Sequence, residues 1–222
     1  MVNLTEIDFG GNELRRTGWE ALIGGLRQID SLSTLNSWNG VQELFSGRLT
    51  RLEAPGKQLA AFALPFVARS SATLTALDLA DNKFHISIEA ELECSLRSIA
   101  LCTALSLLRL GDNLLGAVGG KCLGESLLSL TRLETLDLRN TSLGQDGTEA
   151  LGKGIRAAVG LRVLLLGRAN LGGCGSAFES FRSLTDLREL EIGSNRLGSN
   201  GSAALCEVLP NLCKLEHLDL SE

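Results

Sequence analysis

The chain has 222 residues, of which 44% are hydrophobic and 21% charged, and it carries a formal net charge of −5 at pH 7. Its apolar content, its three prolines and its evenly spread charges are unlike the composition of a disordered chain. No stretch approaches the ~20 consecutive apolar residues of a membrane-spanning helix, and the first residues lack the basic start and apolar run of a signal peptide. These features predict a folded protein of the cytoplasm or nucleus that does not use a membrane as a partner.

Leucine or isoleucine recurs in the spacing L-x-x-L-x-L from one end of the chain to the other. The pattern restarts about every 28 residues, and its first positions are Leu4, Leu32, Leu49, Leu74, Leu105, Leu133, Leu161, Leu187 and Leu215. A unit this short cannot bury its own apolar face and must stack on its neighbours. No linker rich in proline, glycine or serine interrupts the pattern. We therefore expect one elongated domain over residues 1–222, with about eight repeats and a terminal strand.

The repeat over residues 133–160 indicates how each unit is built. Its leucines alternate with Thr135, Asp137 and Arg139, which predicts a short strand with one face buried and these three residues facing water. After a turn, apolar residues over 150–155 recur at helical spacing. Each unit should therefore run strand, turn, helix.

Units of this kind stack into a parallel sheet, because a crossover helix leads from each strand to the next. Strands lie about 4.8 Å apart, whereas packed helices need about 8–10 Å, so the stack must curve with the strands on its concave side. The sequence thus predicts an α/β solenoid in the shape of a horseshoe, with a concave parallel sheet and convex helices.

The early repeats depart from this regularity. Only 17 residues separate Leu32 from Leu49, which leaves no room for a full helix. Pro65 interrupts the helix expected in the next repeat, since proline lacks a backbone N–H and clashes with the preceding turn. We expect irregular repeats over residues 32–73, with a kink or looser helix packing between about residues 36 and 72.

Two other repeat positions carry structural information. Asparagine recurs at the ninth position, where its amide can bond the backbone of the turn and of the next coil, and it occurs there as Asn12, Asn82, Asn113 and Asn195. Thr141 and Ala169 replace it in two repeats, so the ladder of side-chain hydrogen bonds should be weaker there. Glycine recurs at the fifteenth position, for example at Gly119 and Gly147, where the start of the helix is expected to pass close to the neighbouring coil.

Six cysteines occur without a C-x-x-C pair or a nearby histidine, at positions 94, 102, 122, 174, 206 and 213. Cys122 takes the repeat position at which Ala150 stands in the next repeat, so a small buried side chain is expected there. We predict reduced structural thiols and no metal site.

Strand, turn and helix in units near 28 residues, with Leu-Gly after the turn, resemble the ribonuclease-inhibitor-like class of leucine-rich repeats. This class includes ribonuclease inhibitor, the sensor domains of NOD-like receptors and Ran GTPase-activating proteins. The resemblance implies a scaffold or sensor that binds a partner protein on its concave face. Two alternatives stay open, a GTPase-activating protein of the Ran type and a structural component of a larger assembly. The strongly acidic tail of the Ran type does not follow the repeats here.

Catalytic motifs are weak in this chain. Residues 147–153 match the phosphate-loop pattern G-x-x-x-x-G-K, but Gly154 stands where the pattern needs serine or threonine for magnesium, and the segment falls in an expected helix. The two histidines, His85 and His217, are about five coils apart and cannot serve one site. We expect no enzymatic activity and no cofactor.

The predicted concave face is acidic. The third, fifth, seventh and eighth residues of the repeats include eleven acids and four bases, a net charge of −7, which leaves +2 for the rest of the chain. Such a face should attract a basic protein and repel nucleic acid. The same charges also fit a face that is simply wetted by solvent.

Apolar side chains interrupt this acidic face next to arginines on three consecutive strands, as expected of an interaction hot spot. Trp38 is a second candidate anchor, although it could instead cover the gap left by the short helix. The predicted partner-binding residues are Trp38, Leu107, Arg109, Asp112, Asp137, Arg139, Val163, Leu165, Arg168, Glu189 and Glu191.

Both ends of the repeat array lack a recognisable cap. The segment from Leu215 has a strand but no turn or helix, and the strand after Leu4 has no preceding cap. Solenoids normally cover their terminal coils, and exposed apolar edges mark interfaces or truncation. We expect the chain to be part of a longer protein, or to self-associate through its ends.

Overall fold

The computed structural model describes residues 6–8, 34–36, 50–53, 55–56, 64–68, 71–84, 87, 89–173 and 175–221. Strands β1 (Glu6–Asp8) and β2 (Thr34–Asn36) pair in parallel and form a sheet of their own. Both occupy the third to fifth positions of their repeats, as the leucine pattern predicts.

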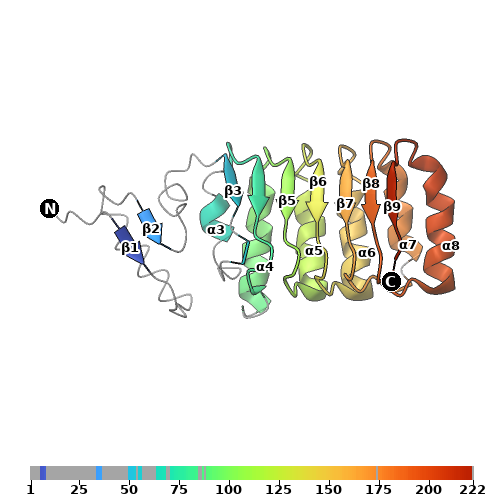
Figure 1. Cartoon of the computed structure of the whole chain (residues 1–222), viewed down its shortest axis with the longest axis horizontal. Coiled ribbons are helices and arrows are strands. Elements are labelled where there is room, and N and C mark those ends of the chain that lie inside the picture. The colour runs from blue at the N-terminus through green and yellow to red at the C-terminus, as the bar shows by residue number, and fades with distance from the viewer. Residues whose placement is uncertain are drawn as a thin grey trace.

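The main sheet has seven parallel strands in chain order (Figure 1). They are β3 (Arg51–Glu53), β4 (Ala76–Asp78), β5 (Leu107–Arg109), β6 (Thr135–Asp137), β7 (Val163–Leu165), β8 (Glu189–Glu191) and β9 (His217–Asp219). Each strand pairs with the next in the same register, so equivalent repeat positions lie side by side. This register turns every repeat position into a row across the sheet.

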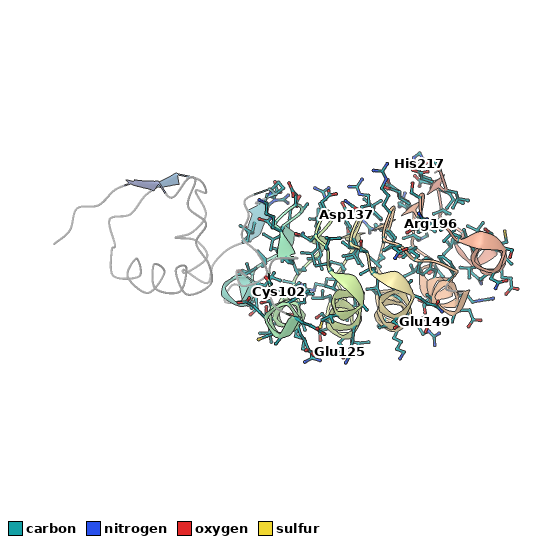
Figure 2. The ribbon with its side chains drawn as sticks, turned by 90° about the horizontal axis from the view of Figure 1, so that it is seen from below. Cys102, Glu125, Asp137, Glu149, Arg196 and His217 are labelled. Carbon is teal, nitrogen blue, oxygen red and sulfur yellow. The ribbon has the colours of Figure 1, made fainter. Side chains whose placement is uncertain are left out.

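Helices connect the strands and lie together on one side of the sheet. They are α3 (Leu64–Val67), α4 (Glu89–Ser98), α5 (Gly116–Leu127), α6 (Gly144–Ile155), α7 (Gly175–Glu179) and α8 (Gly198–Val208). Viewed along the strands, the helices follow the outer side of a gentle arc and the strands follow its inner side (Figure 2). The predicted α/β solenoid, with its parallel sheet and outer helices, is confirmed.

The core is a continuous column of leucines between sheet and helices. In the coil of β6, the first, fourth and sixth positions, Leu133, Leu136 and Leu138, are fully buried. The same positions of neighbouring coils join them in one cluster that extends from Leu52 to Leu212. Burying one leucine side chain contributes roughly 1.5–3 kcal/mol, so this repeated column supplies the main drive for folding.

The predicted asparagine ladder is present at Asn113 and Asn195, while the Asn82 amide donates to the Ala80 carbonyl of its own coil and Asn12 lies outside the described residues. The Asn113 amide nitrogen donates to the Leu79 carbonyl of the previous coil at 2.8 Å, and its oxygen accepts the Asn82 backbone N–H at 2.9 Å. Asn195 donates to the Leu166 carbonyl at 2.7 Å in the same way. These bonds satisfy turn groups that would otherwise be buried without partners.

Where asparagine is replaced, the side-chain bond between coils is lost. The Thr141 hydroxyl donates to the Leu138 carbonyl of its own coil at 2.5 Å. Ala169 has no polar side chain, and the adjoining turn is held by the backbone bond from Leu143 N–H to the Ala169 carbonyl at 2.8 Å. The replacement of asparagine therefore leaves these turns with fewer side-chain bonds, as expected.

Helices α5 and α6 approach each other closely through glycines. A Cβ atom on Gly124 would lie 2.3 Å from the Ala150 carbonyl oxygen, and one on Gly154 would lie 2.1 Å from the Gly124 carbonyl oxygen. Gly147, at the fifteenth position, also lies against the neighbouring coil, since its Cβ would be 2.9 Å from the Ala117 Cα. The prediction is thus confirmed for Gly147 but not for Gly119, where a Cβ would meet the Leu115 side chain of its own coil at 2.3 Å; Gly124 and Gly154 extend the contact along both helices.

The irregular segment is described only in part. Pro65 falls in the single turn of α3, a position that proline tolerates because the first helical N–H groups have no partner. Leu64 and Val67 of this turn are buried in the core. The kink expected between residues 36 and 72 falls largely outside the described residues. At the other end, Leu218 and Leu220 are exposed, and the self-association expected from them stays a prediction.

A candidate protein-interaction face

The strand face is formed by the third, fifth, seventh and eighth residues of the coils from β3 to β9. Its third-position row brings Leu107, Thr135 and Val163 side by side on β5, β6 and β7. All three are half-buried. They form a short row along the inner side of the arc, with apolar side chains at Leu107 and Val163 on either side of Thr135.

The fifth-position row is less exposed than the sequence indicates. Asp137 is 3% exposed and Leu165 is 8% exposed, so the expectation that they face water is wrong. Asp78 is buried as well. The cause is local for the two aspartates: each accepts the backbone N–H two residues on, from Ala80 or Arg139, at 3.1 Å. These carboxylates terminate the strand and do not present a free charge to a partner.

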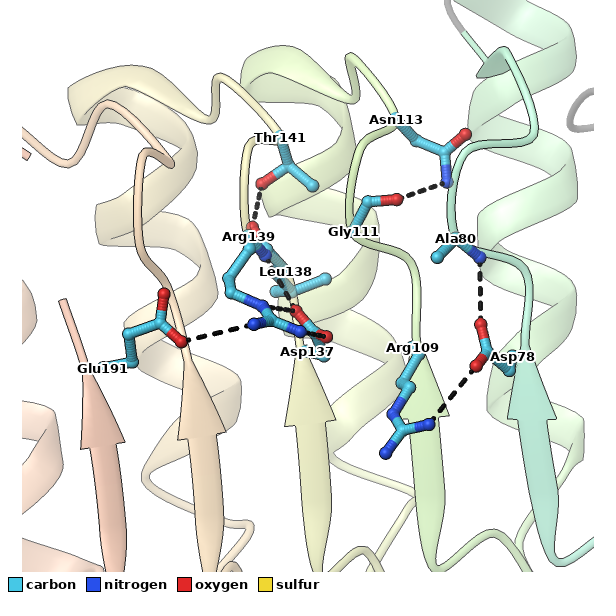
Figure 3. A network of polar contacts seen from close by, with 10 residues as sticks. All are labelled: Asp78, Ala80, Arg109, Gly111, Asn113, Asp137, Leu138, Arg139, Thr141 and Glu191. Atoms are coloured by element: carbon cyan, nitrogen blue, oxygen red, sulfur yellow. Dashed lines mark hydrogen bonds and ion pairs between the residues drawn. The ribbon is translucent and has the colours of Figure 1, made fainter. Parts of the chain in front are cut away.

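Arg139 binds two acids at once (Figure 3). Its Nε donates to Asp137 Oδ1 at 3.0 Å and its Nη2 donates to Asp137 Oδ2 at 2.6 Å, a bidentate pair. Its Nη1 reaches Glu191 Oε2 on β8 at 3.5 Å. The hydrogen bonds to Asp137 raise the pKa of Arg139. Arg139 thus links β6 to β8 across β7, the strand that carries Leu165.

Glu191 lies where Gly167 leaves space. A Cβ on Gly167 would be 2.3 Å from Glu191 Oε1, and one on Gly111 would be 3.2 Å from Asp137 Oδ1. Burial raises the pKa of Glu191, while the nearby Arg139 charge acts in the opposite direction. Glycine at the seventh position therefore makes room for an acid of the next strand.

Arg109 is paired more weakly than Arg139. Its Nη1 donates to Asp78 Oδ2 at 3.4 Å, which is its one ion pair among the described residues. Two of the three predicted hot-spot arginines therefore already bind acids of their own face. Within the described part of the chain, Arg168 has no side-chain hydrogen bond or ion pair and is exposed.

The eighth-position row runs along the turns that follow the strands. Its residues adopt a left-handed backbone, with φ of 52° at Asp81, 58° at Asp112, 53° at Asn140, 54° at Arg168 and 56° at Ser194. The Asn140 amide donates to Asp112 Oδ1 at 3.0 Å. Charge changes sign along this row, from acidic over β4 and β5 to basic over β7.

The predicted partner-binding residues therefore divide into three groups. Leu107, Arg109, Asp112, Arg139, Val163, Arg168, Glu189 and Glu191 have accessible side-chain surface on the strand face. Asp137 and Leu165 are buried, and Trp38 lies outside the described residues. Thr135, Asn140 and Gly167 also belong to this face but were not among the predicted partner-binding residues. A glycine recurring at the seventh position, at Gly111, Gly167 and Gly193, was the available signal.

Catalytic features are weak in the structure too. The segment that resembles a phosphate loop lies inside α6, where its backbone N–H groups belong to the helix. Burial raises the pKa of the Cys102 thiol to about 11, and Cys122 is fully buried as predicted. Among the described residues, no group of three histidine, cysteine or acidic side chains is placed to hold a metal ion. No helix in the described ranges is long and apolar enough to cross a membrane.

Parallel strands, inner leucines and a buried asparagine ladder define the fold as a leucine-rich repeat solenoid. The family model for leucine-rich repeats matches residues 70–85 and 183–206. A leucine-rich repeat protein of Leptospira interrogans is similar in structure, with a TM-score of 0.48 and 19% identity over 99% of this chain. This chain spans 61% of the length of that protein.

An internalin of Listeria monocytogenes, InlF, is more distant. It matches with a TM-score of 0.30 and 14% identity, over 90% of this chain and 74% of the internalin. No curated protein matches this sequence.

Proposed function

We propose that this chain is a protein-interaction module that binds a partner protein on the strand face over β5 to β8. The observation that carries the proposal is the in-register row of Leu107, Thr135 and Val163, half-buried and flanked by Arg109. A small apolar centre with charged groups around it is the composition of a protein-binding surface. Binding of this kind needs no cofactor.

The regular coils also support a place in the ribonuclease-inhibitor-like class. The starts at residues 105, 133 and 161 are 28 residues apart. The helices α5 and α6 each have 12 residues, and α8 has 11. Repeats of this length with a full helix after β5, β6 and β8 support that resemblance.

Charge on the strand face supports a partner with a basic patch. Asp81 and Asp112 are exposed on neighbouring turns near β4 and β5, and Glu189 is exposed on β8. Opposite charge on a partner would raise the encounter rate and would be screened by salt. Binding is accordingly expected to weaken as ionic strength rises.

The test compares matched substitutions on two surfaces. Leu107→Glu with Val163→Glu places charge in the apolar row. Leu128→Glu with Val159→Glu makes the same change at sites that are 59% and 55% exposed at the helix ends. Partners captured from the native cell by the wild-type chain should be lost with the first pair and retained with the second. Equal capture by both variants, or equal loss, would contradict the proposal.

A further inference from the structure

Arg168 and Arg196 are both exposed, and both adopt a left-handed backbone, with φ of 54° and 52°. This conformation is unfavourable for residues with a Cβ, and short polar side chains such as aspartate and asparagine tolerate it best. Arg168 takes the eighth position of its coil, where other coils have Gly56, Asp81, Asp112, Asn140 and Ser194 with the same backbone conformation. Arg196 takes the tenth position of its coil, where other coils have Lys83, Ser142 and Asn170 in this conformation. The local backbone conformation therefore does not explain why arginine occurs at these two positions.

Neither guanidinium binds an acidic side chain among the described residues. Three arginines of the strand face, Arg51, Arg109 and Arg139, each bind an acid of that face. Arg168 and Arg196 have no side-chain hydrogen bond or ion pair in the part of the chain that the structure describes. Two unfavourable backbone conformations thus hold two unpaired positive charges in a chain whose net charge is −5.

The two arginines lie on adjacent coils whose turns run side by side. The Arg168 backbone N–H donates to the Gly193 carbonyl at 3.0 Å, and the Gly172 N–H donates to the Asn195 carbonyl at 3.2 Å. Arg196 follows Asn195 directly. The turn from 168 to 172 is therefore hydrogen-bonded to the segment from 193 to 195, so Arg168 and Arg196 lie on neighbouring turns of the solenoid.

We infer that Arg168 and Arg196 form an anchor for carboxylates of an acidic segment on the partner protein. The inference rests on the proposed function, because it names the chemistry of the partner that occupies the strand face. A guanidinium presents a planar fork of donors that fits a carboxylate in a bidentate pair. Two neighbouring forks without an acid of their own suit a segment with two adjacent carboxylates.

The acids on the same face favour a short acidic segment over an extended polyanion. Asp81 and Asp112 occupy the same eighth-position row as Arg168, over β4 and β5, and Glu189 and Glu191 lie on β8, the strand of the coil that carries Arg196. A nucleic acid or an anionic membrane laid along the face would meet these like charges. A protein can instead place carboxylates at Arg168 and Arg196 and basic groups at Asp81 and Asp112, and this charge pattern fixes its orientation on the face.

The direct test uses nuclear magnetic resonance of the arginine Nε–Hε groups in the full chain. The probe is the capped tetrapeptide acetyl-Gly-Glu-Glu-Gly-amide. The signals of Arg168 and Arg196 should shift together and saturate, and Arg168→Gln with Arg196→Gln should lower the affinity for the probe at least about tenfold. Arg132→Gln with Arg156→Gln is the matched control, since it removes the same charge from exposed arginines elsewhere. Equal losses in the two double variants would overturn the inference.

Titration with other anions tests whether Arg168 and Arg196 prefer the carboxylates of a protein segment to phosphate or lipid headgroups. Inorganic phosphate, a decathymidine oligonucleotide and phosphatidylserine vesicles are titrated in parallel. Stronger binding of any of them at Arg168 and Arg196 than of the glutamate peptide would overturn the assignment to an acidic protein segment.

Capture of the native partner then distinguishes the inference from the proposed function. If charge at Leu107 and Val163 abolishes capture while loss of Arg168 and Arg196 leaves it unchanged, the anchor is wrong and the proposed face stands. If the peptide binds Arg168 and Arg196 but charge at Leu107 and Val163 does not reduce capture of the partner, the proposed face is wrong. Loss of capture with both pairs of substitutions supports both the proposed face and the arginine anchor.

Discussion

Glycine serves opposite purposes on the two sides of this solenoid. Between α5 and α6 it lets backbone touch backbone, because a Cβ on Gly154 would lie 2.1 Å from the Gly124 carbonyl oxygen. On the strand face it leaves room for a side chain, because a Cβ on Gly167 would meet the Glu191 carboxylate at 2.3 Å. Backbone in a packed helix pair cannot move away, whereas the end of a glutamate side chain can.

The comparison separates a rigid region from an adjustable one. On the helix side, added volume strains the packed coils and appears as lost stability. On the strand face, added volume moves Glu191 away from Arg139 and changes the surface offered to a partner. The same substitution, glycine to alanine, therefore reports on folding at one site and on binding at the other.

The largest expected effect is on the helix side. Gly154→Ala should destabilise the chain by about 3 kcal/mol, because the new methyl group overlaps the backbone of α5. Urea unfolding followed by circular dichroism measures this change. Gly160→Ala is the control, since a Cβ there meets the Leu133 carbonyl oxygen at an ordinary 3.6 Å. Similar stability of the two variants would show that α5 and α6 can separate without strain.

A second substitution extends the comparison to the turns between the two sides. Asn113→Ala removes bonds to the Leu79 carbonyl and the Asn82 N–H, and leaves both buried groups without that partner. The expected loss is about 2 kcal/mol. Thr141→Val should cost less, about 1 kcal/mol, since one bond within its own coil is lost. Equal unfolding midpoints for these two variants would contradict the role given to the ladder.

On the strand face, Gly167→Ala should lower stability by less than about 1 kcal/mol, since only Glu191 has to move. The Arg139 Nε–Hε resonance should shift as the Nη1 contact with Glu191 is lost, while the bidentate pair with Asp137 is retained. Partner binding should change although the fold does not. A stability loss as large as that of Gly154→Ala would erase the distinction between the two sides.

The smallest expected effect is the pH dependence of Glu191. Burial raises its pKa, with Arg139 acting against the shift. The folded chain therefore holds this proton more tightly than the unfolded chain, and stability falls as pH rises from the unfolded value through the raised folded value. Glu191→Gln should remove this fall, by no more than about 0.5 kcal/mol because solvent screens the half-buried group.

Unfolding of wild-type and Glu191→Gln chains at a series of pH values between about 4 and 7 measures the difference. The stability of the variant relative to that of the wild type should increase as pH rises. A difference that is flat, or that shrinks with rising pH, would mean that Arg139 outweighs burial at this site.

Much of the fold could be predicted because its signal is local. Each described strand occupies the third to fifth positions of its repeat, as the alternation of leucines indicates. Asn82, Asn113 and Asn195 are buried, the amides of Asn113 and Asn195 bond the neighbouring coil, and Cys122 is buried like the alanine it replaces. The sequence did not predict that α5 and α6 come into close contact at Gly124 and Gly154, because the backbone atoms that exclude a Cβ there belong to the neighbouring coil.

The sequence by itself determined the repeat, the strand and helix of each coil and the buried leucine column, since periodicity fixes which face of a short element is apolar. Only the tertiary structure decided which charges of the strand face are free. Asp137 is buried beneath Arg139, Glu191 lies over Gly167, and Arg168 and Arg196 lie on neighbouring, hydrogen-bonded turns. The last two outcomes depend on the register between coils that lie some 25 to 50 residues apart in the chain, and hydrophobic periodicity does not encode how polar side chains pair across that register.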